Sequence, residues 1–278
     1  MATQTQTRSL PVSPTSRATA GLTPTVSLWW REIVRFYRNR GRVIGVIASP
    51  LLFWVVIGSG FGTSFRSDAP GGQSHYLEYF FPGAVTMIVL FTSIFAMMSV
   101  IEDRKEGFLL SVLVAPVHRS VIVMGKVLGG ATLAALQGLI FLAFTPFLVG
   151  AHLGFDNILP IVLTVFLISF ALTSLGFAIA WPMDSTQAFH AIVNLFLLPL
   201  WMLSGALFPL SGASGWIRVL MQVNPVTYGN EALRALIFPG SASLLPVGTS
   251  LGILAAFAAA MFVWAFVMAN RRTTKPPA

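Results

Sequence analysis

Residues 158–181 read ILPIVLTVFLISFALTSLGFAIAW and contain no charged side chain. The hydrocarbon core of a bilayer is about 30 Å thick, and about 20 apolar residues of α-helix cross it. Five more stretches of the chain have this length and character: residues 43–61, 79–101, 121–149, 188–208 and 246–269. The sequence therefore predicts an all-α integral membrane protein with six transmembrane helices.

The composition of the whole chain is also typical of a protein surrounded by lipid. Of its 278 residues, 55% are hydrophobic and only 9% are charged, whereas soluble domains carry about a quarter charged residues. There is no cysteine, which excludes a disulfide scaffold, a cysteine-ligated zinc site and a cysteine nucleophile. Glycine and proline recur inside the predicted spans, and membrane helices tolerate them where neighbouring helices cover the freed backbone.

The distribution of basic residues predicts the orientation in the membrane. The formal net charge is +8, but the basic residues flank the apolar stretches, which favours a membrane protein over a nucleic-acid-binding one. With six spans, fourteen of the 17 Lys and Arg residues fall on one side, and only Arg66, Arg218 and Arg234 fall on the other. Basic residues concentrate on the cytoplasmic side of membrane proteins. We therefore expect both termini in the cytoplasm, at a bacterial inner membrane.

The chain before the first span divides into two parts. Residues 1–24 are rich in Thr, Ser, Pro and Gln, which predicts a disordered cytoplasmic tail; residues 271–278 form a second tail. Residues 25–42 have apolar and basic positions at helical spacing, which predicts an amphipathic helix at the membrane surface rather than the outer face of a soluble helix. The residues that mark its two faces are Trp29, Trp30, Arg31 and Arg35.

Residues 209–245 lie on the outer side in this topology but are too apolar for an ordinary loop. Residues 216–223 and 228–238 are predicted to form two short helices around Asn224 and Pro225, and neither is long enough to span. At membrane depth, irregular backbone must be buried in protein or line a cavity. We predict a re-entrant helical hairpin that enters from the outer face. A lid lying flat on the surface is the alternative.

No catalytic or nucleotide-binding motif is present in the sequence. The phosphate loop GxxxxGK[ST] and the motifs HExxH and GxSxG are all missing. The centres of the predicted spans also lack the ionisable residues that a gradient-driven carrier uses; Gln137 and Asn194 are their main polar residues. We therefore expect no enzymatic activity, metal or cofactor in this chain, and an energy source in a partner.

The loop after the second span, residues 102–119, starts with mixed charges, continues with apolar residues and ends at a proline. The residues singled out in it are Glu102, Asp103, Arg104, Lys105, Glu106, Gly107, Pro116 and Arg119. Such a charge cluster is most often a solvated loop. This one, however, lies where a cytoplasmic partner can dock, with charges to orient the partner and Phe108 and Leu109 to anchor it.

At these residues the sequence resembles the permease subunits of type-2 ABC exporters, a family that includes daunorubicin-resistance-like permeases. The first family pattern has an acidic–basic start, a glycine, apolar residues, Pro-x-x-Arg and a lysine. It is matched by Glu102, Arg104, Gly107, Leu113, Pro116, Arg119 and Lys126. The second pattern, Asn-Pro-x-x-Tyr followed by Arg, is matched by Asn224, Pro225, Tyr228 and Arg234. Glu231 is spaced i, i+3 from Arg234, so the two residues can pair.

The resemblance extends from the amphipathic helix to the sixth span and implies a role for each part. Residues 25–42 would frame an ATPase, residues 102–107 would form the coupling helix that fits a cleft in that ATPase, and residues 216–238 would shape the exit. It further implies two ATP-binding subunits, which carry ATP and Mg²⁺, and two permeases, either a homodimer or a pair with a sister permease. Membrane lipid surrounds the assembly.

We therefore expect the permease of an ATP-driven exporter for a hydrophobic drug, a natural product or a lipid. Substrate would enter laterally from the inner leaflet, where an amphiphile has the smallest desolvation cost. Export of a lipid-linked polysaccharide is an alternative within transport. A gradient-driven carrier or channel and a membrane-embedded enzyme are alternatives from other classes, and the charge-free span centres and the missing catalytic motifs argue against them.

Overall fold

The structure is a computed structural model that describes residues 16–38, 40–61, 76–114, 118–151, 154–241 and 245–270. These residues form helices and connecting turns and contain no strand, which confirms the all-α prediction. The helices are α1 (Ser16–Arg38), α2 (Arg40–Phe61), α3 (Tyr76–Ala96), α4 (Met98–Lys105), α5 (Phe108–Val114), α6 (Arg119–Ala143), α7 (Thr145–Leu148), α8 (Phe155–Ala180), α9 (Thr186–Trp201), η1 (Met202–Ala206), η2 (Leu210–Gly212), α10 (Gly215–Val223), α11 (Pro225–Ile237) and α12 (Val247–Asn270).

Five segments of the described chain are long and apolar enough to cross a membrane. They are Tyr76–Lys105 (α3 with α4), Arg119–Ala143 (α6), Phe155–Ala180 (α8), Thr186–Ala206 (α9 with η1) and Val247–Asn270 (α12). Each coincides with one of the six stretches predicted from the sequence. The remaining stretch, residues 43–61, lies in α2, which is a helix of 22 residues but is not among the five. A multi-pass membrane protein is confirmed, and the sixth span stays a prediction.

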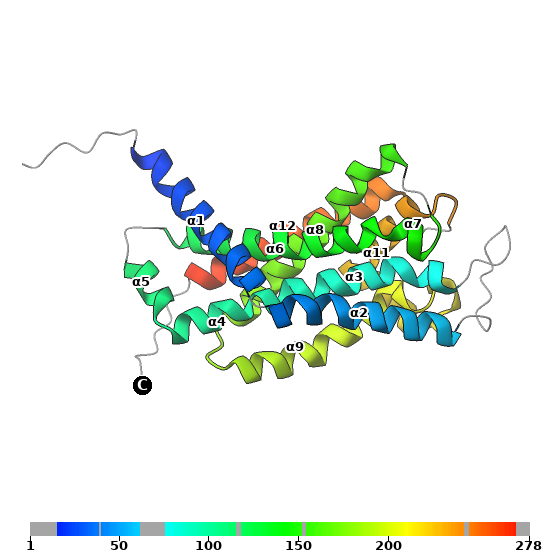
Figure 1. Cartoon of the computed structure of the whole chain (residues 1–278), viewed down its shortest axis with the longest axis horizontal. Helices are drawn as coiled ribbons and strands as arrows, with labels where there is room; N and C mark the ends of the chain where they lie inside the picture. The colour runs from blue at the N-terminus through cyan, green and yellow to red at the C-terminus, as the bar shows by residue number, and fades with distance from the viewer. Residues whose placement is uncertain are drawn as a thin grey trace, which may run out of the picture.

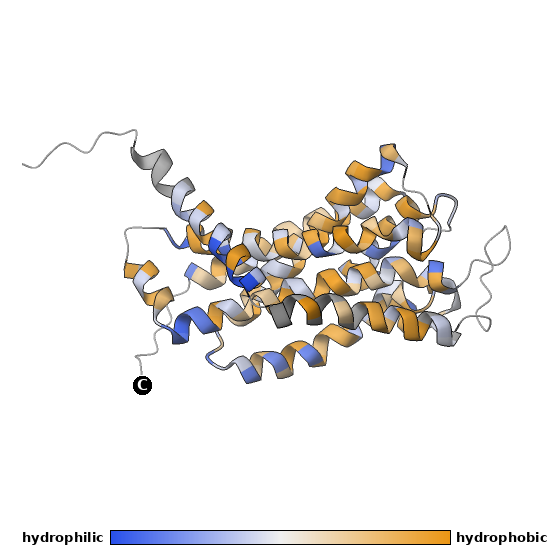
Figure 2. Cartoon of the chain, viewed as in Figure 1, coloured by the Kyte–Doolittle hydropathy of each residue, from blue (hydrophilic) through white to orange (hydrophobic). Residues whose placement is uncertain are grey.

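The long helices run side by side along one axis of the molecule (Figure 1). Helix α3 is the central element: most of its residues are buried, and it contacts α2, α6, α8, α9, η1 and α11. Helix α12 packs mainly on α8, and α9 lies on the opposite side of the bundle from α8. Figure 2 shows hydrophilic residues gathered at the end of α4 and on the half of α1 that faces it.

Glycines permit the closest helix contacts. A Cβ atom on Gly125 or Gly129 of α6 would lie 2.7 Å from Leu28 Cβ or 2.8 Å from Glu32 Cβ, so α1 packs directly on the backbone of α6. A Cβ on Gly83 of α3 would lie 2.9 Å from the Cα of Ala206 in η1. Small residues at interfaces are the usual device by which membrane helices approach one another.

The N-terminal boundaries differ from the prediction. Helix α1 begins at Ser16 and continues through Pro24, so residues 16–24 are helical and the prediction of a disordered tail is wrong for them; residues 1–15 and 271–278 lie outside the described residues. Pro24 removes one backbone hydrogen bond from the helix. The helix ends at Arg38, so residues 40–42 belong to α2.

The segment after α9 agrees more closely with the prediction. Two short helices, α10 and α11, meet at Asn224 and Pro225, as expected from the sequence. Asn224 is the N-cap of α11: its side-chain oxygen accepts a hydrogen bond from the Val226 amide at 3.0 Å. Pro225 occupies the first helical position, where its missing N–H costs nothing. Whether this pair of helices enters the bilayer stays a prediction.

Candidate functional site

A group of charged residues, buried at its centre and half-buried at its edge, joins α1, α4 and α6 at one end of the bundle, and we call it the Lys126 cluster. Its members are Arg31, Glu32 and Arg35 of α1, Ser99, Glu102 and Asp103 of α4, and Lys126 of α6. The Lys126 side chain is 1% exposed. Its ammonium group donates to Glu32 Oε1 at 2.6 Å and to Ser99 Oγ at 3.1 Å, and it also contacts the Asp103 carboxylate.

Asp103 is the acceptor at the centre of this cluster. It is fully buried, and Arg31 binds both of its oxygens, at 2.9 and 2.7 Å. Arg35 donates to Asp103 Oδ1 at 2.7 Å and to Glu102 Oε2 at 2.9 Å. Hydrogen bonding to Asp103 raises the pKa of the Arg31 guanidinium above its ordinary value, although burial opposes the shift. Bidentate bonds between arginine and carboxylate are among the strongest that side chains make.

The charges of the Lys126 cluster balance, since three cationic side chains face three carboxylates. An isolated buried charge is costly, and pairing with hydrogen bonds offsets that cost. The cluster forms because α1 lies directly on Gly125 and Gly129, which brings Glu32 within reach of Lys126. Trp29 adds a second link: its indole nitrogen donates to Thr132 Oγ1 of α6 at 3.1 Å. The cluster therefore fixes α1 to two candidate spans.

The charged side chains of α1 point toward the protein. Arg31 and Arg35 bind carboxylates of α4. The exposed side carries apolar residues, among them Val26, Trp30 and Val34. The guanidinium groups thus hold the helix to its own chain, and the exposed side of the helix is largely apolar.

The predicted coupling helix at residues 102–107 is not a separate helix. These residues continue the second predicted span to Lys105, and a turn follows in which Gly107 has φ 76°. Glu102 and Asp103 point toward α1, where Arg31 and Arg35 bind them. Asp103 follows Ser99 by one helical turn, and both residues contact Lys126 of α6. Lys105 and Glu106 are the charged residues that stay exposed.

Arg104 has a different partner, the end of α8. Its guanidinium donates to the carbonyl oxygens of Trp181 and, at 2.9 Å, of Met183, and it pairs with Asp184 at 3.2 Å. The last carbonyls of a helix have no partner within the helix, and a basic side chain satisfies them. Arg119 acts in the same way at the start of α6, where it donates to Ala269 of α12 at 3.0 Å. Both arginines join neighbouring helices of this chain.

The separate short helix of this region is α5, which follows the Gly107 turn at the same end of the bundle (Figure 1). The Arg31 guanidinium lies over the Phe108 ring, 3.7 Å from its centroid, and Leu109 is buried. Leu110 and Val114 are 62% and 86% exposed. In this region of the chain, the exposed apolar surface is therefore on α5, which follows the charged residues 102–106. Pro116, the predicted end of this helix, lies outside the described residues.

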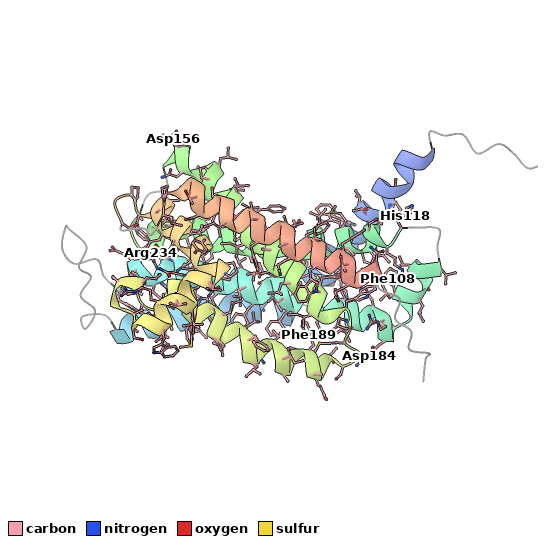
Figure 3. The ribbon with its side chains drawn as sticks, turned by 180° about the vertical axis from the view of Figure 1, so that it is seen from behind. Phe108, His118, Asp156, Asp184, Phe189 and Arg234 are labelled. Carbon is pink, nitrogen blue, oxygen red and sulfur yellow. The ribbon has the colours of Figure 1, made fainter. Side chains whose placement is uncertain are left out.

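A second buried cluster lies at the opposite end, and Figure 3 places Arg234 far from Phe108 and His118. We call it the Arg234 cluster; it consists of Tyr79, Gly205, Glu231 and Arg234. Arg234 pairs with Glu231, as the i, i+3 spacing predicts, and both side chains are buried. Arg234 also donates to the Gly205 carbonyl oxygen at 2.8 Å and lies 4.2 Å from the centroid of the Tyr79 ring. The Tyr79 hydroxyl donates to the same carbonyl at 2.9 Å.

The Arg234 cluster forms where the helix of α9 breaks. The backbone passes through η1, in which Gly205 has φ 73°, a conformation that glycine adopts without steric cost. The break leaves carbonyl oxygens without helical partners, and buried carbonyls need donors. Side chains of α3, α10–α11 and their turn supply them: Asn224 to Leu200 at 2.6 Å, Thr227 to Leu203 at 3.3 Å, Asn230 to Ser204 at 3.2 Å and Tyr76 to Leu207 at 3.1 Å.

The sequence motif Asn-Pro-x-x-Tyr therefore has a structural explanation. Asn224 both caps α11 and supports the broken helix, and the Tyr228 hydroxyl donates to Gln222 of α10 at 2.6 Å. Thr227 and Asn230 were missed by the sequence analysis. Their signal was present: they are polar residues that follow Asn224 at intervals of three positions.

Neither cluster has the composition of a catalytic or metal centre. Among the described residues, no group of three or more His, Cys, Asp or Glu side chains is placed to hold a metal ion. In both clusters the charged groups are bonded to one another or to backbone carbonyls. The arrangement joins helices, and exposed apolar side chains lie on α1, α5, α9 and α10 as well as on α2, α6, α8 and α12.

Comparison with known proteins places these features in a family. The model of the ABC-2 type transporter family matches residues 23–238. The daunorubicin resistance ABC transporter permease protein DrrB1 of Streptomyces coeruleorubidus is 24% identical over 253 residues, which cover 87% of this chain and 86% of the relative. The inner membrane transport permease YadH of Escherichia coli K12 is 27% identical over 254 residues, 88% of this chain and 94% of the relative. The putative transport permease ycf38 of Cyanophora paradoxa is 28% identical over 209 residues, 74% and 71%.

The Lys126 cluster predicts an unequal response to single and double substitutions. Lys126→Met leaves the Glu32 and Asp103 carboxylates facing each other in a buried site, and breaking a buried ion pair costs about 3–5 kcal/mol. The double variant Glu32→Gln/Lys126→Met removes one of those carboxylates and should be the more stable of the two. Thermal unfolding in detergent measures both. Lys105→Met, which removes an exposed charge nearby, is the control and should leave the melting temperature unchanged; equal loss in all three variants would contradict the assignment.

The Arg234 cluster gives a parallel prediction for transport. Arg234→Ala leaves the Glu231 carboxylate buried without its guanidinium, so it should reduce export and thermal stability more than Glu231→Ala/Arg234→Ala does. Arg218→Ala is the matched control, because this arginine of the same segment is exposed and bonds backbone carbonyls, so its removal leaves no buried carboxylate behind. Mild and equal effects from all three variants would instead favour a solvated lid.

Proposed function

The chain belongs to the ABC-2 type transporter family and is a permease subunit of an ABC transporter, and from this premise we propose that it exports a hydrophobic drug, a natural product or a lipid. The family match over residues 23–238 carries the proposal. A relative that covers most of the chain is named for daunorubicin resistance. The apolar span interiors suit a cargo that leaves the inner leaflet, since such a cargo sheds little hydration.

We further propose that α2 is the sixth span and that both termini are cytoplasmic in a bacterial inner membrane. The charge distribution supports this, because the end of the bundle with α5 and the start of α6 carries most of the Lys and Arg residues. A relative of similar length is named as an inner membrane permease. In this orientation the Lys126 cluster lies near the cytoplasm and the Arg234 cluster near the outer face.

In this orientation, the exposed apolar sides of α10 and α1 fit the outer and inner surfaces of the membrane. On α10, Trp216, Val219, Leu220 and Val223 follow the i, i+3, i+4, i+7 spacing of one helix face and are all exposed. Helix α11 behind it is mostly buried. Both features support a hairpin that enters the outer leaflet. On α1, the exposed apolar side supports contact with the cytoplasmic surface of the membrane, between headgroups and acyl chains.

The proposed partners are two copies of an ATPase, which bind ATP and Mg²⁺, and a second permease. The exposed side of α5 is the surface best suited to the ATPase, since Leu110 and Val114 are apolar and exposed beside the charged Lys105 and Glu106. Anchoring residues of this kind contribute most of the binding energy at protein interfaces. Movement of α5 would reach the spans through Phe108, which packs under Arg31 and thereby contacts the Lys126 cluster.

Dependence on an ATPase is the central test of the proposal. The purified chain should not hydrolyse ATP, because it has no phosphate loop. With its ATPase partner, reconstituted liposomes should export an amphiphilic cargo only when ATP is supplied. Leu110→Arg on α5 should prevent association of the two subunits and leave the bundle folded, because the side chain is exposed. Ser211→Arg, an exposed change at the opposite end, should have no effect.

Two results would contradict parts of this proposal. Wild-type association and export by Leu110→Arg would exclude α5 as the docking surface. Export by the permease without any ATPase, driven by an ion gradient, would exclude an ABC exporter and favour a carrier. A requirement for a lipid-linked sugar as cargo would move the assignment to polysaccharide export.

Orientation is tested by accessibility of single thiols, since the chain contains no cysteine. Ser211→Cys should react with a membrane-impermeant maleimide added to intact cells, because Ser211 is exposed at the end of the bundle assigned to the outside. Lys105→Cys should react only after the cells are opened. Reaction of Lys105→Cys in intact cells would reverse the topology and remove α5 from the cytoplasm.

A further inference from the structure

A groove of about 390 Å³ lies between α6 and α8, which are two of the five candidate spans. All of the side chains that line it are apolar except Thr132. The largest of the apolar ones are Leu136, Leu139, Leu159, Leu163 and Phe166. An apolar cavity of about 150 Å³ stays dry and admits benzene, so this groove has room for a longer piece of hydrocarbon. We call it the α6–α8 groove.

Helix α1 borders the groove at one end. Thr132 is the lining residue nearest the start of α6, and its hydroxyl accepts a hydrogen bond from the Trp29 indole at 3.1 Å. The α8 side of the groove begins near the other end of the bundle, where Figure 3 labels Asp156. A groove that stops against α1 suits a tail that is held in place. It does not form a path across the bilayer.

Asp156 lies above the groove, in the first turn of α8. It shares one face of the helix with Leu159, Leu163 and Phe166, which follow it at i+3, i+7 and i+10. Its side chain is exposed and, within the described residues, makes no ion pair. A carboxylate in the first turn also favours the helix dipole, so the residue type alone indicates no ligand. The alignment of this carboxylate with an apolar groove is the informative feature.

The length of this arrangement matches one leaflet of a bilayer. Phe166 follows Asp156 by ten residues, which corresponds to about 15 Å along an α-helix. The hydrocarbon core of the whole bilayer is about 30 Å thick. A lipid with its headgroup at Asp156 would therefore extend its acyl chain along the full α8 side of the groove.

We infer that the α6–α8 groove binds an acyl chain of a phospholipid whose headgroup has a primary ammonium, and that Asp156 binds this ammonium. The ammonium supplies a positive charge and three N–H donors, which complement a carboxylate. The inference goes beyond the proposed function, because the site requires a bilayer but neither ATP nor a cargo. The proposed orientation assigns the lipid to the outer leaflet.

Other occupants fit the groove and its mouth less well. Water would find one polar side chain in the groove, the Thr132 hydroxyl, which is already bonded to Trp29. An anionic phospholipid would bring a second negative charge to the Asp156 carboxylate. A quaternary ammonium keeps the positive charge but has no N–H donor. Affinity should therefore be highest for a primary ammonium, lower for a quaternary one and lowest for an anionic headgroup.

Native mass spectrometry of the purified chain in detergent, with defined lipids added, tests this order. Phosphatidylethanolamine, phosphatidylcholine and phosphatidylglycerol with identical acyl chains supply the primary ammonium, the quaternary ammonium and the anionic headgroup. We expect one lipid to remain bound to each chain and the affinities to follow the order given. The measurement uses no ATPase and no cargo, so its result is independent of the test of export.

Substitutions that fill the groove test its part in binding. Leu163→Trp places an indole in the groove and should abolish the bound lipid. Leu159→Trp, at a position that is 76% exposed, is a second filling variant that is easily tolerated by the fold. Val263→Trp on α12 is the matched control, because Val263 is an exposed apolar residue of another span, and it should retain the lipid. The melting temperature of each variant without added lipid confirms that it is folded.

Asp156→Asn tests recognition of the headgroup. It keeps the size of the side chain and removes its charge, so the preference for phosphatidylethanolamine over phosphatidylglycerol should fall about two- to fivefold, as expected for an exposed ion pair. Asp156→Glu should retain the preference. Asp184→Asn is the control, because it removes an exposed carboxylate at the opposite end of the bundle (Figure 3) and should change neither affinity.

Four outcomes overturn the inference. Equal lipid binding by the folded Trp variants of α8 and by Val263→Trp would place the lipid elsewhere. An unchanged headgroup preference in Asp156→Asn would remove this carboxylate from the site. One-for-one release of the lipid by a cationic amphiphilic drug would assign the groove to cargo. Dissociation of a dimer in Leu163→Trp, with the lipid still bound, would assign the groove to a second copy of the chain.

Discussion

Bilayer hydrocarbon contains no water, so each buried charge and each freed backbone carbonyl of this chain needs a partner within the protein. The two clusters meet this requirement at opposite ends of the bundle. At one end, three carboxylates and three cations balance around Asp103 and Lys126. At the other, the break at Gly205 exposes carbonyl oxygens, and donors from α3 and α11 bind them. Helix packing elsewhere depends on these two groups being satisfied.

Features that depend on local sequence were predictable. The length of apolar stretches located five spans within a few residues, because the thickness of the bilayer sets the helix length. The junction of α10 and α11 was predicted around Asn224 and Pro225, although the second helix begins at Pro225 and not at residue 228, because Asn224 caps it and proline suits its first position. The pairing of Glu231 with Arg234 followed from helical spacing. Each of these results needs only residues that are close in the chain.

Features that depend on distant residues were not predictable. The charges at 102–104 read as a free surface, because their partners lie elsewhere: Asp103 binds Arg31, 72 residues away, and Lys126 binds Glu32, 94 residues away. The contact also requires Gly125 and Gly129 to admit α1, and neither glycine reveals its partner in the sequence. A charged helix end is identical in sequence whether it binds an ATPase or its own chain. For this reason we propose α5, and not residues 102–107, as the docking surface.

One continuous segment connects the two clusters. Helices α3 and α4 contribute Tyr79 to the Arg234 cluster and Asp103 to the Lys126 cluster. Between them, at Met97, the backbone bonds shorten to an i, i+3 pattern, from Met97 to Ile94 and from Val100 to Met97. Such a tighter turn within a helix is a place where two halves can move separately. A displacement of α4 at the Lys126 cluster can therefore bend the segment at Met97 instead of moving α3 with it.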